Sequence, residues 1–185
     1  MQLTRASISE VALNILDTYG LADVSMRRVA STLGVAPGAL YWHISNKQEL
    51  IANLAEIIIA PLVDAPPADP ATACSHLRAA LLAHRDGAEV VITAVAQPGS
   101  TVARQLATTM HRALAPGQVD APADADSHAA AEGLLHMTLG AAYVHQSAAQ
   151  LAEATGTESA SGGADTPRAI ELLLAGLRAS ISEAD

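Results

Sequence analysis

Hydrophobic and polar positions along this chain repeat with the period of an α-helix. In the first segment, apolar residues recur at i, i+3, i+4, i+7 and i+8 from Ile8 to Leu16. Gly20 follows as a stop, because glycine readily adopts the left-handed conformation that ends helices. No segment shows sustained alternation of apolar and polar residues, as a half-buried strand would. The pattern therefore predicts an all-α protein.

Proline, glycine and capping residues divide the rest of the chain into further helices. Ser25 is placed to cap the second helix, and Pro37 fits the first turn of a short third helix. The fourth begins at Ser45 or Asn46, since either residue starts a capping box, and runs to Pro61. The predicted later spans are 25–33, 37–43, 45–61, 69–85, 86–97, 100–114, 128–153 and 167–182.

Three connections have a composition that does not favour helix. Residues 64–70 form a rigid, polar connection, and 115–127 form a loop rich in proline and aspartate. At the end of this loop, Ser127 is placed to cap the long helix over 128–153. Residues 154–166 have low hydrophobicity, so we expect them to be mobile.

The segment 25–43 carries the clearest functional signal. Its two helices are joined by residues 34–36, which is the length of a helix-turn-helix connection. A short helix presented in this way fits the DNA major groove, with its first residues against base edges. Tyr41, Trp42 and His43 have polar tips that can donate to phosphates. The aromatic pair could equally pack in a small core, and periodicity alone does not decide between the two interpretations.

Net charge first argues against a nucleic-acid partner, because the 185 residues carry a formal charge of −9. The charge is unevenly distributed, however. Residues 1–50 have four basic and four acidic side chains, whereas the remainder has six basic and fifteen acidic ones. The basic residues of the first part lie at or near helix starts: Arg5, Arg27, Arg28 and Lys47. The acidity therefore belongs to the second part, and the first part can still meet phosphate.

Composition also excludes several classes of protein. A single cysteine, Cys74, cannot form an intrachain disulfide or a cysteine-rich zinc site. Glu10 and Asp17 interrupt the first apolar stretch, so we expect no signal peptide. The longest charge-free run, 133–152, contains polar side chains and is interpreted as a buried helix, not a membrane span. We expect a cytoplasmic protein without membrane contact.

Seven histidines raise the question of metal binding or catalysis. His76 and His84 are eight residues apart, as are His128 and His136, whereas ligands on one turn lie at i and i+4. Cys74 lies near His76 but has no visible acid to orient a catalytic pair. We therefore expect no catalytic residues, no cofactor and no metal site, and interpret the histidines as interface or surface residues.

Three runs resemble the tetracycline-repressor (TetR) family, whose members are homodimeric transcriptional regulators. They are VSMRRVASTLGVAPGALYWHISNKQELI (24–51), ALLAHRDGAEV (80–90) and TLGAAYVHQ (138–146). The resemblance implies a helix-turn-helix DNA-binding domain over 1–45, a connecting helix over 46–62, and an effector-binding and dimerisation domain over 63–185. It further implies that helices 128–153 and 167–182 pair with their equivalents in a second copy. The small residues of the first helix permit close approach, and the apolar stripe from Ile170 to Ile181 would be too large to leave exposed.

The resemblance also assigns DNA contacts position by position. Arg27 matches a base-reading arginine, which can bond guanine in bidentate fashion. Pro37, Gly38 and Ala39 match base-facing positions, and since tetracycline repressors have larger or more polar residues there, the operator should differ. Positions that mainly contact the DNA backbone are matched by Tyr41, Trp42, His43 and Lys47. Arg28 lies beside Arg27 in the first turn of the helix that crosses the DNA backbone in such folds.

The effector site departs further from the tetracycline repressors. Positions matching those that hold tetracycline and magnesium are apolar here: Val63, Ala73, Val91, Ala94 and Val144. A buried polar drug would lose its partners, so we expect no tetracycline–magnesium binding. The predicted apolar pocket comprises Leu77, Val91, Leu106, Met110, Leu135 and Leu139, with His136 and Tyr143 as a polar pair.

The sequence therefore favours a repressor that binds a palindromic double-stranded DNA operator and is released by a small apolar effector. Effector binding would select the form whose recognition helices are wrongly spaced, with the helix over 46–60 as the lever. Two alternatives stay open. One is a DNA-binding regulator without a small-molecule effector, and the other is a helical small-molecule-binding protein that no longer binds DNA.

Overall fold

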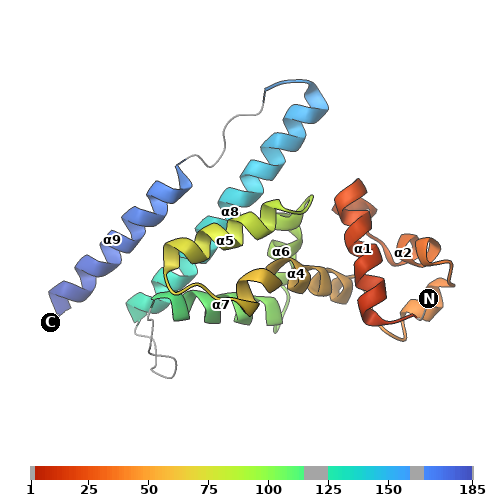
Figure 1. The fold of residues 1–185 in the computed structure, drawn as a ribbon, viewed down its shortest axis with the longest axis horizontal. Coiled ribbons are helices and arrows are strands. Elements are labelled where there is room, and N and C mark those ends of the chain that lie inside the picture. The colour runs from red at the N-terminus through yellow and green to blue at the C-terminus, as the bar shows by residue number, and fades with distance from the viewer. Residues whose placement is uncertain (1–2, 115–124, 159–164, 185) are drawn as a thin grey trace.

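The structure, a computed structural model, describes residues 3–114, 125–158 and 165–184, and within these ranges it contains helices and no strands. This confirms the predicted all-α class (Figure 1). The elements in order are α1 (Arg5–Tyr19), a 3₁₀ turn (Leu21–Asp23), α2 (Met26–Leu33), α3 (Pro37–Leu40), α4 (Lys47–Asp64), α5 (Pro70–Leu82), α6 (Gly87–Val95), α7 (Thr101–Leu114), α8 (Ala125–Thr155) and α9 (Thr166–Ala184).

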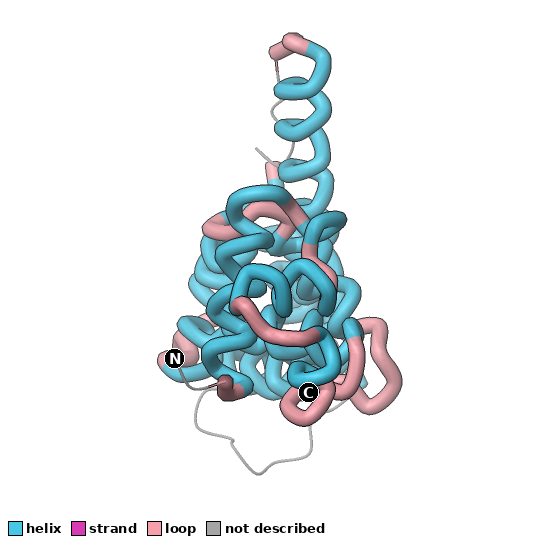
Figure 2. The backbone as a smooth tube through the Cα atoms, turned by 90° about the vertical axis from the view of Figure 1, so that its right-hand side faces the viewer, coloured by secondary structure: helices cyan, strands magenta, loops and turns pink. Residues whose placement is uncertain are grey.

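The helices are arranged as a small head and a larger body (Figure 1). We call α1–α3 the head and α5–α9 the body. Helix α4 packs against α1 in the head and against α5, α6 and α7 in the body, so it belongs to both. Helices α8 and α9 pack side by side at the far side of the body, and the last turns of α8 extend beyond the other helices (Figures 1 and 2).

Local capping explains where the head helices begin and end. The side chain of Ser25 accepts the N–H of Arg28 at 3.2 Å, which confirms the predicted cap of α2. Gly34 then ends α2 with φ 70°, a conformation that glycine adopts without strain. Of the two possible caps of α4, Asn46 is the one used, since its side chain accepts the N–H of Glu49 at 2.8 Å.

Two predicted helix ends differ from the structure. Helix α4 continues through Pro61 to Asp64. Pro61 removes one hydrogen bond of the helix, and the burial of the next residue, Leu62, in the core offsets that loss. Helix α5 ends at Leu82, several residues before the predicted end. The turn that follows α5 includes Asp86, which has a positive φ of 55° and directly precedes α6.

The other differences concern the third and eighth helices. Helix α3 ends at Leu40, and residues 41–43 form a turn. Helix α8 begins at Ala125, so Ser127 lies inside its first turn and is not the predicted cap. It also extends to Thr155, where Gly156 follows with φ 66°. Most of the predicted 115–127 loop, and residues 159–164 of the predicted mobile segment, lie outside the described residues.

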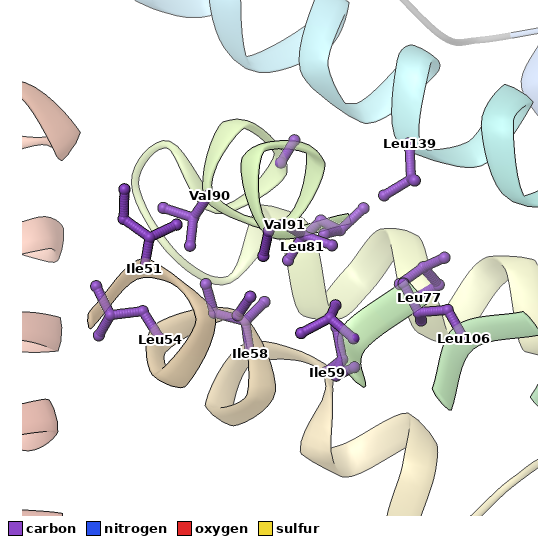
Figure 3. Packing of buried hydrophobic residues seen from close by; sticks show 14 of the residues in the cluster. Ile51, Leu54, Ile58, Ile59, Leu77, Leu81, Val90, Val91, Leu106 and Leu139 are labelled. Atoms are coloured by element: carbon purple, nitrogen blue, oxygen red, sulfur yellow. The ribbon is translucent and has the colours of Figure 1, made fainter. Parts of the chain in front are cut away.

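The core of the body forms around α4 (Figure 3). Ile51, Leu54, Ile58 and Ile59 of α4 are buried, and they share one cluster with residues of the body. Those body residues come from α5, α6, α7 and α8: Leu77, Leu81, Val90, Val91, Leu106 and Leu139. A helix whose apolar side chains are built into the body core will move with the body, which makes α4 a rigid connection to the head.

Candidate functional site: a nucleic-acid interface

Helices α2 and α3 form the helix-turn-helix that the sequence predicted. Helix α3 is a single turn, and it is held in place because Leu40 and Ile44 are fully buried beneath it. Pro37 and Gly38 are exposed, and Ala39 is half-buried. No atom lies within 4 Å of a Cβ placed on Gly38. The start of α3 is therefore a small, open surface that another macromolecule can approach closely.

The two aromatic residues after α3 point away from the core. Trp42 is 89% exposed and Tyr41 is 54% exposed, whereas His43 is half-buried. This placement excludes the interpretation that the pair packs a small core. A fully exposed tryptophan is a large amphipathic surface with a donor at its tip, which suits a contact with a polar partner.

The four cations of the N-terminal part separate into two kinds. Arg28 pairs with Asp23, and its guanidinium lies 4.1 Å from the centroid of the Tyr19 ring. Arg5 lies 2.5 Å from a carboxylate oxygen of Glu49. Arg27 and Lys47, in contrast, are exposed and make no ion pair within the described residues. These last two are the cations that the head can offer to a partner.

The ion pair at Glu49 joins the start of α1 to the start of α4. Both carboxylate oxygens of Glu49 are used, because the Ser45 N–H donates to the second one at 2.7 Å. The hydrogen bond from Ser45, assisted by the charge of Arg5, lowers the pKa of Glu49 below its ordinary value of 4.5. Glu49 is therefore ionised at neutral pH and holds the N-terminal ends of the two helices together.

A second connection between head and body was not foreseen from the sequence. The end of α1 contacts the turn between α5 and α6, which contains Asp86. Asp86 accepts the N–H of Leu21 at 2.7 Å and also a hydrogen bond from the Gln150 side chain. Nearby, Nδ1 of His84 lies 3.0 Å from a carboxylate oxygen of Asp17. The same turn thus contacts both the head and α8.

Gln146 of α8 reinforces this turn from the body side. Its amide nitrogen donates to the carbonyl oxygens of Leu81 and His84 at 3.1 and 2.8 Å, and its amide oxygen accepts the N–H of Ala88 at 3.0 Å. Leu81 is in the last turn of α5 and Ala88 is in the first turn of α6, where helix ends leave main-chain groups without partners inside the helix. The HRDG run marked this region in the sequence, but no local signal indicated that glutamines of α8 satisfy it.

The predicted effector residues are divided between the core and the surface of the body. Six of them are buried in the body core: Leu77, Val91, Leu106, Met110, Leu135 and Leu139. His136 and Tyr143 are instead exposed on α8. One cavity of about 310 Å³ lies elsewhere, between the first half of α4 and the chain around residues 97–102. Another, of about 270 Å³, lies between residues 82–86 and α8. The assignment of an effector pocket remains a prediction.

An apolar face on α8 and α9 is exposed in the single chain. Tyr143, Val144, Leu151 and Leu172 are the large hydrophobic residues of this kind, and Leu151 is 65% exposed. Gly140 of α8 has no atom within 4 Å of a Cβ placed on it, so another helix can approach there. No described helix is both long enough and apolar enough to cross a membrane.

Residues 8–54, which run from α1 into α4, match the profile of a family described as "Bacterial regulatory proteins, tetR family". Tetracycline repressor protein class C from Escherichia coli is 38% identical over 98 residues, covering 48% of this chain and 44% of the repressor. The chain thus matches less than half the length of the curated tetracycline repressors.

Solved structures match over nearly the whole chain. BioQ from Mycobacterium smegmatis is 36% identical, covers 96% of this chain and 99% of that one, and has a TM-score of 0.80. BioQ with its natural double-stranded DNA operator is 35% identical, with coverages of 95% and 98% and a TM-score of 0.77. The TetR family protein ActR from Streptomyces coelicolor, in complex with (S)-DNPA, is 26% identical, with coverages of 97% and 100% and a TM-score of 0.69.

Together, the head, its exposed aromatic and cationic residues, and the rigid connection through α4 define a helix-turn-helix regulator with a helical body. The likeness to BioQ extends over 99% of that chain at 36% identity. The chain belongs to the tetracycline-repressor (TetR) family of bacterial transcriptional regulators.

Proposed function

We propose that the protein is a repressor that binds a palindromic double-stranded DNA operator through its head. The main observation in support is the exposure of Trp42. This residue follows α3, whose first residues have small side chains, and the nearby cations Arg27 and Lys47 make no ion pair within the described residues. Phosphate contacts position such a protein and base contacts specify the sequence. The structure of BioQ with its operator supports the same use of the head here.

The residues of the head have different proposed roles. Arg27 reads a guanine, and Pro37, Gly38 and Ala39 face base edges. Contacts with the DNA backbone come from the remaining exposed or half-buried set: Tyr41, Trp42, His43 and Lys47. Arg28 was predicted to join them, but its guanidinium is paired with Asp23. We therefore propose that it mainly braces the start of α2.

A gel-shift titration with the upstream region of the protein's own gene tests this proposal. Arg27→Ala should weaken operator binding by about 1–3 kcal/mol, whereas Lys47→Ala should mainly reduce the salt dependence, by about one unit of slope. Arg112→Ala is the matched control, because Arg112 is an exposed arginine of the body. Unchanged affinity of Arg27→Ala would show that the assigned base contact is wrong.

We propose that two copies pair through α8 and α9 to form a homodimer. The support is the exposed apolar face of α8 and α9, which includes Val144 and Leu151. Val144→Asp should convert the dimer to a monomer in analytical ultracentrifugation. It should also abolish specific operator binding, because the two heads must be held about 34–36 Å apart. Ile57→Asp is the control, since Ile57 is an exposed apolar residue of α4. A dimeric Val144→Asp variant contradicts the assignment.

We further propose that a small apolar effector releases the protein from DNA. ActR in complex with (S)-DNPA supports ligand binding within a body of this kind. Because Leu77, Val91 and Leu106 are fully buried here, effector entry requires them to move apart, and α4 would transmit that movement to the head. Loss of the gel shift on adding an apolar compound tests the proposal. The close packing of these residues also supports the alternative, a DNA-binding regulator without a small-molecule effector.

We propose that the functions are distributed along the predicted domain boundaries. Residues 1–45 bind DNA, residues 46–62 form the connecting helix, and residues 63–185 bind the effector and form the dimer. The domains are proposed to work as one unit, because the turn at Asp86 joins α1 to α8. A gel shift with the full chain also separates these functions from the last alternative, a small-molecule-binding protein that does not recognise DNA.

A further inference from the structure

Two histidines from different helices meet at the end of the body that lies away from the turn at Asp86. His111 is in the last turn of α7, and His128 is in the first turn of α8. Nε2 of His111 lies 3.2 Å from Nδ1 of His128. The ring centroids are 5.2 Å apart and the ring planes differ by 16°, so the two rings are nearly parallel.

A carboxylate stands behind one of these rings. Glu132, one turn along α8, places Oε1 3.7 Å from Nε2 of His128, which is the nitrogen on the far side of that ring. At this distance the two groups are close enough for an electrostatic interaction but too far apart for a hydrogen bond. The negative charge of Glu132 favours a proton on Nε2 of His128, so Nδ1 is the nitrogen with an electron pair directed to the His111 side.

We propose that His111 and His128 form a two-imidazole site for a divalent transition-metal ion such as Zn²⁺. With Zn–N bonds of 2.0–2.1 Å and tetrahedral angles, two nitrogen ligands lie about 3.3 Å apart. The nitrogens in this structure are 3.2 Å apart. Imidazole binds Zn²⁺, Cu²⁺ and Ni²⁺ well, whereas Mg²⁺ prefers oxygen ligands, so the site should select transition metals.

The surroundings are compatible with metal entry. The side chain of His128 is 60% exposed and can turn toward an ion without disturbing the core. No group of three or more His, Cys, Asp and Glu side chains surrounds a metal position within the described ranges. Water would therefore complete the coordination, and we expect micromolar affinity.

A metal ion at this site would link the end of α7 to the start of α8. The ion would stabilise the folded body, because the unfolded chain does not hold the two rings together. This effect is independent of operator binding, since the site belongs to the body and not to the head.

The test uses the untagged full-length chain, stripped with EDTA and titrated with ZnCl₂ by isothermal calorimetry. We expect one Zn²⁺ per chain, a melting temperature that rises with Zn²⁺ and falls again with EDTA, and no response to Mg²⁺. His111→Gln and His128→Gln should each weaken Zn²⁺ binding by at least about tenfold. Glu132→Gln should weaken it by about tenfold, as other outer carboxylates do.

His76→Gln is the matched control, because His76 is an exposed histidine on α5, and it should bind Zn²⁺ as the wild type does. Melting temperatures without metal show whether each variant is folded, and the exposed His128 variant keeps the test valid if the His111 variant unfolds. The proposal is overturned if the wild type fails to bind Zn²⁺ below millimolar concentration. It is also overturned if the folded His128 variant binds as tightly as the wild type, or if Zn²⁺ leaves the melting temperature unchanged.

Discussion

Removing the carboxylate of Asp86 tests the connection between the head and the body. Asp86 accepts the Leu21 N–H at 2.7 Å and a hydrogen bond from Gln150, so one side chain joins the 3₁₀ turn after α1 to α8. It also has a φ of 55°, which is unfavourable for residues other than glycine, asparagine and aspartate. Two variants separate these effects: Asp86→Gly removes the carboxylate but accepts the backbone, whereas Asp86→Ala removes the carboxylate and strains the backbone.

The expected magnitudes follow from these contacts. A hydrogen bond to a charged group contributes about 1.5–3 kcal/mol, and the Leu21 N–H would be left without its partner. We therefore expect Asp86→Gly to lower the free energy of unfolding by about 2–3 kcal/mol. Asp86→Ala should lose about 1 kcal/mol more, because a Cβ is disfavoured in the left-handed region.

Urea denaturation of the variants measures these changes, and amide hydrogen exchange reports on Leu21 itself. Asp64→Ala is a suitable control, since Asp64 is exposed at the end of α4, and it should change stability by less than about 0.5 kcal/mol. The reasoning is refuted if Asp86→Gly is as stable as the wild type and protection of the Leu21 amide is unchanged. If instead Asp86→Ala and Asp86→Gly have the same free energy of unfolding, the proposed backbone strain is contradicted, whereas the proposed role of the hydrogen bonds is not.

Three further predictions concern other local contacts. Gly87→Ala should lower the free energy of unfolding by about 2–3 kcal/mol, measured by urea denaturation, because the new Cβ would lie 2.3 Å from the carbonyl oxygen of Leu81. Ser25→Ala should cost about 1 kcal/mol through loss of the α2 cap, and an unchanged thermal melt would contradict the cap. Glu49, whose pKa is lowered chiefly by the Ser45 hydrogen bond, stabilises the folded state above its unfolded pKa. That contribution should disappear as the pH falls through the folded pKa, so a stability difference between wild type and Glu49→Gln that persists in acid would contradict it.

The local structure of the head was predictable because short-range chemistry determines it. Ser25 caps α2 through a residue three positions away, and Gly34 ends α2 by adopting a positive φ. The turn of 34–36 between two short helices was sufficient to indicate a helix-turn-helix. The predicted end of the fourth helix at Pro61 was wrong because it relied on a local rule alone. In the structure, burial of Leu62 in the core favours continuation of the helix beyond the proline.

The sequence was sufficient to predict which residue types form the candidate interface. It was not sufficient to predict which of the charged side chains are left without an ion-pair partner. The sequence placed Arg27, Arg28 and Lys47 together, and only the structure shows that Arg28 is paired with Asp23. Likewise, exposure of Trp42 settles an alternative that periodicity left open. Both points depend on where side chains lie in three dimensions, which spacing along a helix does not specify.

The sequence by itself determined the helical class, the helix-turn-helix and the division of charge between head and body. These properties depend on periodicity, caps and composition, which act over a few residues at a time. The tertiary structure decided which distant groups meet: Asp86 with Leu21, and His111 with His128, which are 17 residues apart. Such contacts form because packing of the whole core brings separate helices together, and no local pattern in the chain encodes the distance between them.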